Sequence, residues 1–270
     1  MADNPKYIVL DKKIGQTPLE VLEAWRVNHS DLANTPMAYA GRLDPMASGK
    51  LLILIGEECK HQESYHGLDK TYLFSVLFGV SSDSGDVLGL LTESGNKEVT
   101  RMSVEKILPS LCGPIELPYP IFSSRTVLGK PLHTWALENR LSEITIPTKK
   151  SNIYELKLDH LEQKTRALIV AEANDKIESI PRVTDPKKAL GNDFRRPDIR
   201  KSWLEFSRTG SEDDLFSIAT FTGTASSGTY MRSLAEAIAN KVASTGLAFS
   251  IHRTEIGQYD AVAKVWTKCF

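Results

Sequence analysis

The sequence has no long hydrophobic run, few cysteines and no excess of charge of either sign. Its longest apolar stretches, such as residues 51–55, are far too short to cross a bilayer as a helix. The three cysteines, Cys59, Cys112 and Cys269, show no paired spacing, which excludes a disulfide framework and fits a reducing compartment. The N-terminus has no basic start followed by an apolar run, so no signal peptide is visible. We therefore expect a cytoplasmic protein with no membrane partner.

Signatures of the common cofactor and metal sites are absent as well. The sequence contains no phosphate-binding P-loop, no dinucleotide fingerprint and no Gly-x-Ser-x-Gly nucleophile elbow. Cys59, His61 and His66 resemble a set of metal ligands, but on a helix His61 would point away from the other two. Asp83 and Asp86 lack the full calcium-loop pattern and its terminal Glu. We predict no metal and no organic cofactor.

The charge of the chain is nearly balanced, with 33 basic and 34 acidic residues among 270 and a formal net charge of −1. A strongly basic chain, the simplest sign of nucleic-acid binding, is therefore missing. One segment departs from this balance, because residues 182–208 hold eight Lys and Arg against four Asp and Glu. The segment shows no clear helical period. We interpret it as an exposed insertion, within about residues 175–213, that either contacts nucleic-acid phosphate or lies in solvent.

The composition, 41% hydrophobic and 25% charged, is typical of a globular protein, and we expect a single domain. Residues 51–55 fit either a buried strand or a helix, and residues 34–49 are loop-like because they are rich in Pro, Gly, Ala and Ser. The periodicity predicts strands at 6–10, 71–78, 154–158, 167–171 and 216–221, and helices at 103–111, 132–140 and 229–243. Strands and helices mix without regular βαβ alternation, which favours the α+β class.

The start of a first helix is clearly marked. Thr17 is the N-cap candidate, Pro18 takes the first helical position and Glu20 completes a capping box. The helix predicted near the C-terminus has an apolar face with one-turn spacing, formed by Met231, Leu234, Ala235, Ile238 and Val242.

The sharpest local feature is the run from Tyr39 to Gly49, which contains Asp44 followed by Pro45. A residue before Pro is biased towards extended or turn conformations, so Asp44 should project from a loop. The flanking glycines would allow another backbone or a ligand to approach closely. On spacing alone, Asp44 can equally be a residue that merely caps a turn.

This run resembles the catalytic loop of the pseudouridine synthases, specifically the TruB type that modifies the T-loop of tRNA. The matching residues are Gly41, Leu43, Asp44, Pro45, Ala47, Ser48, Gly49 and Leu51. A second segment matches the family's strand and turn through Lys70, Thr71, Tyr72, Gly79, Asp83, Ser84, Asp86 and Gly89. A third matches its Gly-Thr-Tyr-x-Arg segment through Gly228, Thr229, Tyr230, Met231, Arg232 and Leu234. Three motifs in register form a strong signal.

The resemblance implies a long, bent, mostly antiparallel sheet flanked by helices, with an RNA-binding lobe inserted after the Tyr72 strand. It implies that Asp44 is the nucleophile, that Tyr72 stacks on the uracil and accepts a proton, and that Arg232 pairs with Asp44. Further residues are expected to bind the substrate, namely Tyr39, Arg42, Lys70, Gly228, Tyr230, Ile251, Lys12 and Lys130. The amides of residues 227–229, at a predicted helix N-terminus, are candidates for holding a phosphate or for ordinary capping.

The reaction suits these residues. Isomerising uridine to pseudouridine breaks the glycosidic C–N bond and rejoins the sugar through carbon, which needs a carboxylate and no redox cofactor. An arginine can hold such a carboxylate in its ionised form. A base within folded RNA must first be flipped out of its stack, at a cost of a few kcal/mol.

The expected function is therefore formation of pseudouridine 55 in the T-loop of tRNA by a monomer without a C-terminal PUA-like domain. Two alternatives stay open. Gly-Arg-Leu-Asp at 41–44 also resembles the loop of synthases that act on rRNA. Departures from the family pattern at Tyr39, Ala40, Arg42 and Thr126 also leave room for an RNA-binding or tRNA-folding module that has the fold but no activity.

Overall fold

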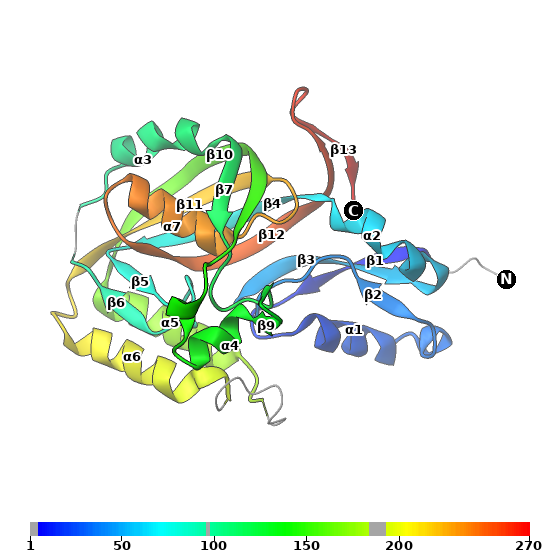
Figure 1. Cartoon of the computed structure of the whole chain (residues 1–270), viewed down its shortest axis with the longest axis horizontal. Coiled ribbons are helices and arrows are strands. Elements are labelled where there is room, and N and C mark those ends of the chain that lie inside the picture. The colour runs from blue at the N-terminus through cyan, green and yellow to red at the C-terminus, as the bar shows by residue number, and fades with distance from the viewer. Residues whose placement is uncertain (1–4, 96–97, 184–192) are drawn as a thin grey trace.

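The computed structural model describes residues 5–95, 98–183 and 193–270. A nine-stranded sheet forms its centre (Figure 1). Seven strands follow one another across the sheet in the order β1 (Tyr7–Lys12), β3 (Ala47–Ile55), β12 (Gly246–Asp260), β4 (Asp69–Phe78), β11 (Leu215–Ala225), β10 (Thr148–Thr165) and β7 (Gly113–Pro118). Two more pair at the side of this path, β2 (Met37–Tyr39) with β3 and β13 (Val265–Cys269) with β12.

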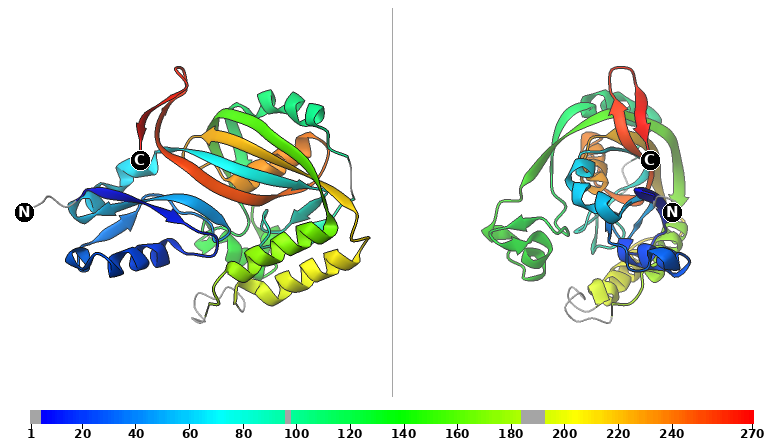
Figure 2. Two further views of the ribbon diagram at one scale, coloured as in Figure 1. Left: turned by 180° about the vertical axis from the view of Figure 1, so that it is seen from behind. Right: turned by 90° about the vertical axis from the view of Figure 1, so that its right-hand side faces the viewer.

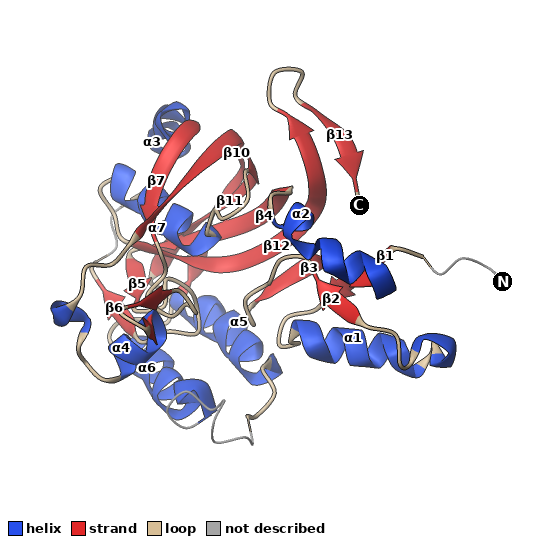
Figure 3. Ribbon diagram, turned by 45° about the vertical axis from the view of Figure 1, so that its right-hand side comes forward, coloured by secondary structure: helices blue, strands red, loops and turns tan. Residues whose placement is uncertain are grey.

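Helices and two small hairpins complete the described part of the chain. The helices are α1 (Pro18–Val27), α2 (Gln62–His66), α3 (Arg101–Ile107), α4 (Leu132–Leu137), α5 (Arg166–Ser179), α6 (Arg196–Arg208) and α7 (Met231–Lys241). The hairpins pair β5 (Val80–Ser82) with β6 (Leu91–Glu93) and β8 (Thr126–Val127) with β9 (Lys130–Pro131). Figure 3 shows helices placed around a central sheet, which confirms the α+β prediction.

Antiparallel pairing dominates the sheet, as predicted. Among the named strand pairs β3 and β12 are parallel, with Ala47, Ser48 and Gly49 opposite Ile251, His252 and Arg253. Every other strand pair assigned within the described residues is antiparallel. The parallel contact joins the short N-terminal strands to the rest of the sheet.

The main hydrophobic core includes the face of the bent sheet on which α7 packs, where α7 contacts β12 and β4 (Figure 2). Leu234, Ala235 and Ile238 of α7 are fully buried, which confirms the apolar face predicted from the sequence. Beneath them the rings of Phe74 and Phe221, on β4 and β11, stack with centroids 5.4 Å apart. This packing fixes the start of α7 relative to β4.

The first helix begins as the sequence predicts. The Thr17 hydroxyl accepts a hydrogen bond from the Glu20 amide, and the Glu20 carboxylate accepts one from the Thr17 amide. Leu22 is buried against β3, whereas Trp25 is only half-buried and stacks on His29. The capping box thus sets where the chain turns back after β1.

Two predictions of secondary structure near the site and in α5 are wrong. Residues 34–49 are a loop only in part, because β2 and the start of β3 lie within them, and residues 51–55 belong to the strand β3. Residues 167–171 form the first turns of α5 instead of a strand. Thr165 caps this helix by accepting from the Leu168 amide, and its buried positions follow a helical spacing at Ile169, Ala173 and Ile177.

The basic segment is also different from its prediction. Residues 196–208 form α6, which lies beside α5 (Figures 1 and 2). Ile199, Trp203 and Phe206 have i, i+4, i+7 spacing and are buried in the main core, so this part is a packed helix with a regular period. Lys187 and Lys188 lie outside the described residues.

Most of the described basic side chains of this segment have acidic partners. Ion pairs join Arg195 to Asp83, Arg196 to Asp193, Arg200 to Glu178 and Lys201 to Glu205. Arg196 is itself buried. The description of this segment as exposed is therefore wrong for Arg195 and Arg196, whose side chains are 12% and 6% exposed, whereas the Lys201 side chain is 74% exposed. A contact of the segment with nucleic-acid phosphate stays a prediction.

The segment between β7 and β10 forms a small lobe outside the sheet. Residues 119–147 leave the sheet and carry β8, β9 and α4, which form a lobe at one side of the molecule (Figure 2). The Lys130 ammonium pairs with Glu138 at 2.6 Å and lies 4.7 Å from the centroid of the Trp135 ring. An RNA-binding lobe was expected after the Tyr72 strand, and its RNA-binding role stays a prediction.

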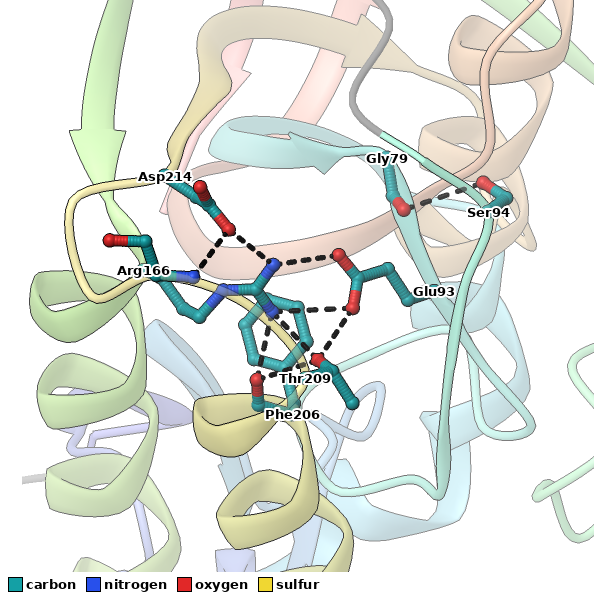
Figure 4. A network of polar contacts seen from close by, with 8 residues as sticks. Gly79, Glu93, Ser94, Arg166, Phe206, Thr209 and Asp214 are labelled. Atoms are coloured by element: carbon teal, nitrogen blue, oxygen red, sulfur yellow. Dashed lines mark hydrogen bonds and ion pairs between the residues drawn. The ribbon is translucent and has the colours of Figure 1, made fainter.

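A buried arginine ties α5, α6, β6 and β11 together (Figure 4). The Arg166 guanidinium donates to Glu93 at 2.8 Å and to Asp214 at 3.1 Å, and also to the Phe206 carbonyl at 2.8 Å. The same group lies 4.3 Å from the centroid of the Phe206 ring. Arg166 therefore connects α5 and α6 to the strand β6 and to the residue before β11.

Replacing Arg166 by Met is expected to destabilise the fold by about 3–5 kcal/mol at pH 7, because two carboxylates lose a buried cationic partner. The hydrogen bond from Arg166 lowers the pKa of Glu93 below its usual value of 4.5. The ionised Glu93 carboxylate therefore stabilises the folded wild type above pH 4.5, and this stabilisation is lost as the pH falls through the lowered pKa of the folded state. The difference in stability between the wild type and Arg166→Met should therefore become smaller in acid. Urea unfolding at pH 7 and at acid pH measures both effects.

Arg101→Met is the matched control, since Arg101 pairs with Glu105 one turn away and both side chains are about half exposed. Its loss should stay below about 1 kcal/mol. Equal losses in the two variants would contradict the role given to Arg166.

No helix among the described residues is long and apolar enough to span a membrane.

Candidate active site

The site is built around the loop between β2 and β3, and the end of β1 holds this loop in place. The Lys12 ammonium donates to the carbonyls of Ala47 at 2.5 Å and Pro45 at 3.4 Å. The Gly15 amide donates to the same Pro45 carbonyl at 2.9 Å. Asp44, just before this anchored point, keeps 39% of its side chain exposed and so remains available to a ligand.

A close approach of two backbones supports the loop from the other side. Gly49 has φ +104°, and a Cβ atom there would lie 2.2 Å from the Arg253 carbonyl oxygen on the parallel strand β12. Only glycine fits this position. Arg253 is 1% exposed, and its guanidinium donates to the Lys50 carbonyl at 2.8 Å and to the Arg42 carbonyl at 3.2 Å. The approach of another backbone that the glycines predict is confirmed here.

The side chain of Arg232, in the first turn of α7, reaches Asp44. The Arg232 Nε atom lies 2.8 Å from Asp44 Oδ2, and the Arg232 side chain is 5% exposed. Its Nη1 atom donates to the carbonyls of Ser84 at 2.9 Å and Phe122 at 3.3 Å. The contact expected between Arg232 and Asp44 is present, and the guanidinium is fixed by two further segments of chain.

Asp86 is a member of the site that sequence reasoning missed. Its Oδ2 atom lies 3.7 Å from Arg232 Nε, and the Ser84 hydroxyl and the Leu88 amide donate to its Oδ1 atom. Burial raises the pKa of Asp86 above its usual value, against the opposing effect of Arg232. The signal for this residue was the Asp-Ser-x-Asp turn, which was matched above to the family's strand and turn and compared with a calcium loop, without a role being given to Asp86.

A cavity of about 340 Å³ opens beside Asp44 and gathers residues from all three motifs. Tyr72 on β4 and Ile251 on β12 contribute largely buried walls. The other predicted residues that line the cavity are Arg42, Lys70, Gly228, Tyr230 and Arg232. A volume of this size accommodates a flipped pyrimidine base.

Lys70 lines this cavity, and its pKa is lowered there. Its ammonium donates to the Leu68 carbonyl and, at 3.3 Å, to the Ser227 hydroxyl. Burial and the neighbouring Arg253 lower the pKa of Lys70 to about 8. Lys70 therefore lies where a ligand in the cavity could contact it, and its expected contact with a phosphate stays a prediction.

Three other residues expected to bind the substrate lie elsewhere. Tyr39 packs on the side of α1 and β3, against Val21 and Leu22, and is not among the described residues that line the cavity. Lys12 is fully buried under the loop, so it cannot reach a phosphate in this conformation. Lys130 lies in the lobe of residues 119–147, paired with an acid.

The start of α7 also differs from the sequence prediction. The helix begins at Met231 with Tyr230 as N-cap, so residues 227–229 form a turn before it and not its N-terminus. Gly228 has φ +86° and lies so close to the Lys149 side chain that a Cβ atom would contact Lys149 Cε at 2.5 Å. The turn places the edge of the cavity next to a cation.

Replacing Lys12 by Met should remove the donor of the loop carbonyls and destabilise the fold by about 1–3 kcal/mol at pH 7. Burial lowers the pKa of Lys12 to about 8, from an ordinary value of 10.5. Between these values the unfolded chain binds more protons, so wild-type stability gains with rising pH while the variant lacks that gain. The gap should therefore widen from pH 7 to pH 10 in denaturant titrations.

Lys13→Met, at the exposed neighbouring position, provides the comparison and should show neither effect. A gap for Lys12→Met that is constant with pH would mean that the ammonium is not desolvated as described.

The arrangement suits a reaction at one carboxylate on the wall of a cavity that is open to a ligand from outside. Asp44 lines the cavity, and its carboxylate contacts the fixed guanidinium of Arg232 at 2.8 Å, which orients it for attack on a ligand. Tyr72 offers an aromatic face and a phenol. Among the described residues no cluster of three or more His, Cys, Asp or Glu side chains has the geometry of a metal site.

Comparison with known proteins adds an independent observation. Residues 31–176 match the family described as TruB family pseudouridylate synthase (N terminal domain). A tRNA pseudouridine synthase B from Caldicellulosiruptor saccharolyticus is 34% identical over 151 residues, 56% of this chain and 50% of the relative. The tRNA pseudouridine synthase 4 of Saccharomyces cerevisiae is 34% identical over 129 residues, 47% of this chain and 32% of the relative. This chain spans about half the length of such curated relatives, or less.

Solved structures show the same fold at low sequence identity. A chain of a Cbf5–Nop10–Gar1 complex superposes with a TM-score of 0.53 at 14% identity, over 93% of this chain and 48% of the other. A chain of an H/ACA RNP bound to a substrate RNA containing 2′-deoxyuridine gives 0.51 at 13% identity, over 92% and 46%. The family match covers more than half of the sequence, and its residues converge on one cavity: the chain belongs to the TruB family of pseudouridylate synthases.

Proposed function

We propose that this protein is a tRNA pseudouridine synthase that isomerises uridine 55 of the T-loop. The observation that carries the proposal is the contact of Asp44 with the buried Arg232, at 2.8 Å, on the wall of a cavity that Tyr72 also lines. Membership of the TruB family and relatives named as tRNA pseudouridine synthases support the choice of tRNA.

In the proposed reaction the target nucleotide leaves the RNA stack and its uracil enters the cavity of about 340 Å³. The Asp44 carboxylate acts as nucleophile while the bond between C1′ of the ribose and N1 of uracil breaks. The freed base turns and forms a bond between C1′ and C5, and the bond that the Asp44 carboxylate had formed to C1′ breaks in this step, so that the free carboxylate is regenerated. The C5 proton is removed, N1 takes up a proton, and no atom is gained or lost overall.

The other residues assist these steps. Arg232 orients the Asp44 carboxylate through their contact at 2.8 Å. Tyr72 stacks on the base and its phenol accepts the C5 proton. Ile251, 5% exposed, closes the apolar side of the cavity. Arg42 is exposed at its mouth and is the best-placed predicted cation for an RNA phosphate.

The direct test incubates the purified protein with unmodified tRNA transcripts and maps pseudouridine chemically. We expect modification at position 55, and none in a transcript with cytidine at that position. A matched rRNA fragment tests the alternative target. Tight tRNA binding without modification of any uridine would favour an RNA-binding module and reject the enzymatic proposal.

A further inference from the structure

The chain enters α6 through strained backbone. Asp193, Phe194 and Arg195 have φ values of 51°, 55° and 60°, in the left-handed region that residues other than glycine rarely adopt. Three such residues in succession need compensating contacts. The contacts of Arg195 supply them.

The Arg195 side chain contacts two separate segments of chain, one at Asp83 and one at Phe122. Its Nη1 and Nη2 atoms donate to the two carboxylate oxygens of Asp83, at 2.6 and 3.1 Å. Its guanidinium also lies 3.8 Å from the centroid of the Phe122 ring. The Arg195 side chain is 12% exposed and that of Asp83 is 36% exposed, so the guanidinium is largely buried while the carboxylate keeps contact with solvent. A planar fork that binds a carboxylate at its edge and an aromatic ring at its face is specific to arginine.

The two gripped segments are those that hold Arg232. The residue after Asp83, Ser84, and the ring-bearing Phe122 supply the carbonyls that accept from Arg232 Nη1. Arg232 in turn contacts Asp44. A chain of direct contacts therefore runs from Arg195 to the proposed nucleophile.

Arg195 and Asp44 both line a second cavity, of about 150 Å³. Arg195 is absent from the described residues that line the larger cavity assigned to the uracil. It can thus act on the reaction through the residues it positions and not by contact with the reacting base.

We propose that Arg195 is a positioning residue that holds the turn of residues 83–86 and the segment around Phe122, and thereby orients Arg232 on Asp44. The catalytic part of this inference rests on the proposed function. It gives Arg195 a role different from the phosphate contact that the charge of its segment suggested.

The experiment compares Arg195→Ala with Arg200→Ala. Arg200 is a matched control because it lies in α6, five residues further along, and also forms a two-pronged ion pair, with Glu178 at 2.6 Å. For Arg195→Ala we expect the single-turnover rate of pseudouridine formation to fall about 10- to 100-fold, as misplacement by about 1 Å does in other enzymes. The Kd for tRNA and its salt dependence should not change. Arg200→Ala should keep the wild-type rate.

Two further variants separate this role from a folding defect. Arg195→Asn lacks the guanidinium but tolerates the left-handed backbone, so it should be as slow as Arg195→Ala while its thermal unfolding stays close to that of the wild type. Asp83→Asn should slow the reaction similarly, and the double variant should be no slower than either single one. Additive losses would overturn the proposed grip of Arg195 on Asp83.

Amide hydrogen exchange tests the same contact without using activity. Exchange at residues 83–90 and 119–124 should become faster in Arg195→Ala and not in Arg200→Ala. If the wild type modifies no RNA, the proposed function fails while the exchange data still decide whether Arg195 holds these segments. Unchanged exchange, a wild-type rate, or an equal weakening of tRNA binding and salt dependence in both variants would overturn the inference.

Discussion

Asp44→Asn is expected to lower the rate of pseudouridine formation by about 10⁴-fold or more, the usual cost of removing a nucleophile. An amide cannot attack the ribose carbon, and it also removes the charge that faces Arg232 at 2.8 Å. Binding of tRNA should change little, because the side chain is one small contact in a large RNA interface. Single-turnover rates and a filter-binding Kd, measured with the same transcript, check both statements.

Asp31→Asn is the control for this variant, since Asp31 is an exposed aspartate that does not line the cavity among the described residues. Asp44→Ala should be as inactive as Asp44→Asn. Turnover retained by either Asp44 variant would show that another group is the nucleophile, and thermal unfolding of both variants establishes that the fold is intact.

Arg232→Met should have the second largest effect, because it impairs activity and stability together. The rate should fall about 10²- to 10³-fold, as expected when a preorganised charged partner is removed. Asp86 would remain buried without its cation, at a cost of about 3–5 kcal/mol. Burial already raises the pKa of Asp86 and Arg232 opposes this, so the variant should raise that pKa further. Stability would then be lost progressively as the pH rises through the higher pKa.

The double variant Arg232→Met/Asp86→Asn separates the two effects. The substituted amide at position 86 would carry no charge, and it keeps an oxygen for the Leu88 amide and the Ser84 hydroxyl that now bond to Asp86. Stability in urea should recover by more than half and should lose the added pH dependence, while activity stays low. Recovery of activity in the double variant would mean that Arg232 serves only to neutralise Asp86.

The sequence predicts the site better than it predicts the elements around it. Asp44, Tyr72 and Arg232 lie far apart in the chain, yet each sits in a motif that resembles one found in the TruB-type pseudouridine synthases, and this resemblance is what singled them out. The structure brings these three residues to one cavity. Their roles in catalysis stay predictions.

The misplaced elements have physical reasons. Residues 167–171 are an apolar run with a β-branched pair, which local pattern alone cannot distinguish from a strand, and the capping hydroxyl of Thr165 decides for the helix. Lys12 looked like a surface cation because lysine is rarely buried, whereas here three carbonyls receive its ammonium. Acceptors that reach a buried lysine from distant parts of the chain cannot be read from the spacing of residues in the sequence.

The parallel contact between β3 and β12 has a consequence for biosynthesis. It joins Gly49 to Arg253, about 200 residues later in the chain. The loop that carries Asp44 leaves the ribosome early, but the strand that supports it emerges among the last residues of this sequence. Closing so long a loop is entropically costly and slow. Until residues 246–260 have been synthesised, a nascent chain therefore lacks the support that β12 gives to the site loop, and the site is completed only when β12 is inserted between β3 and β4.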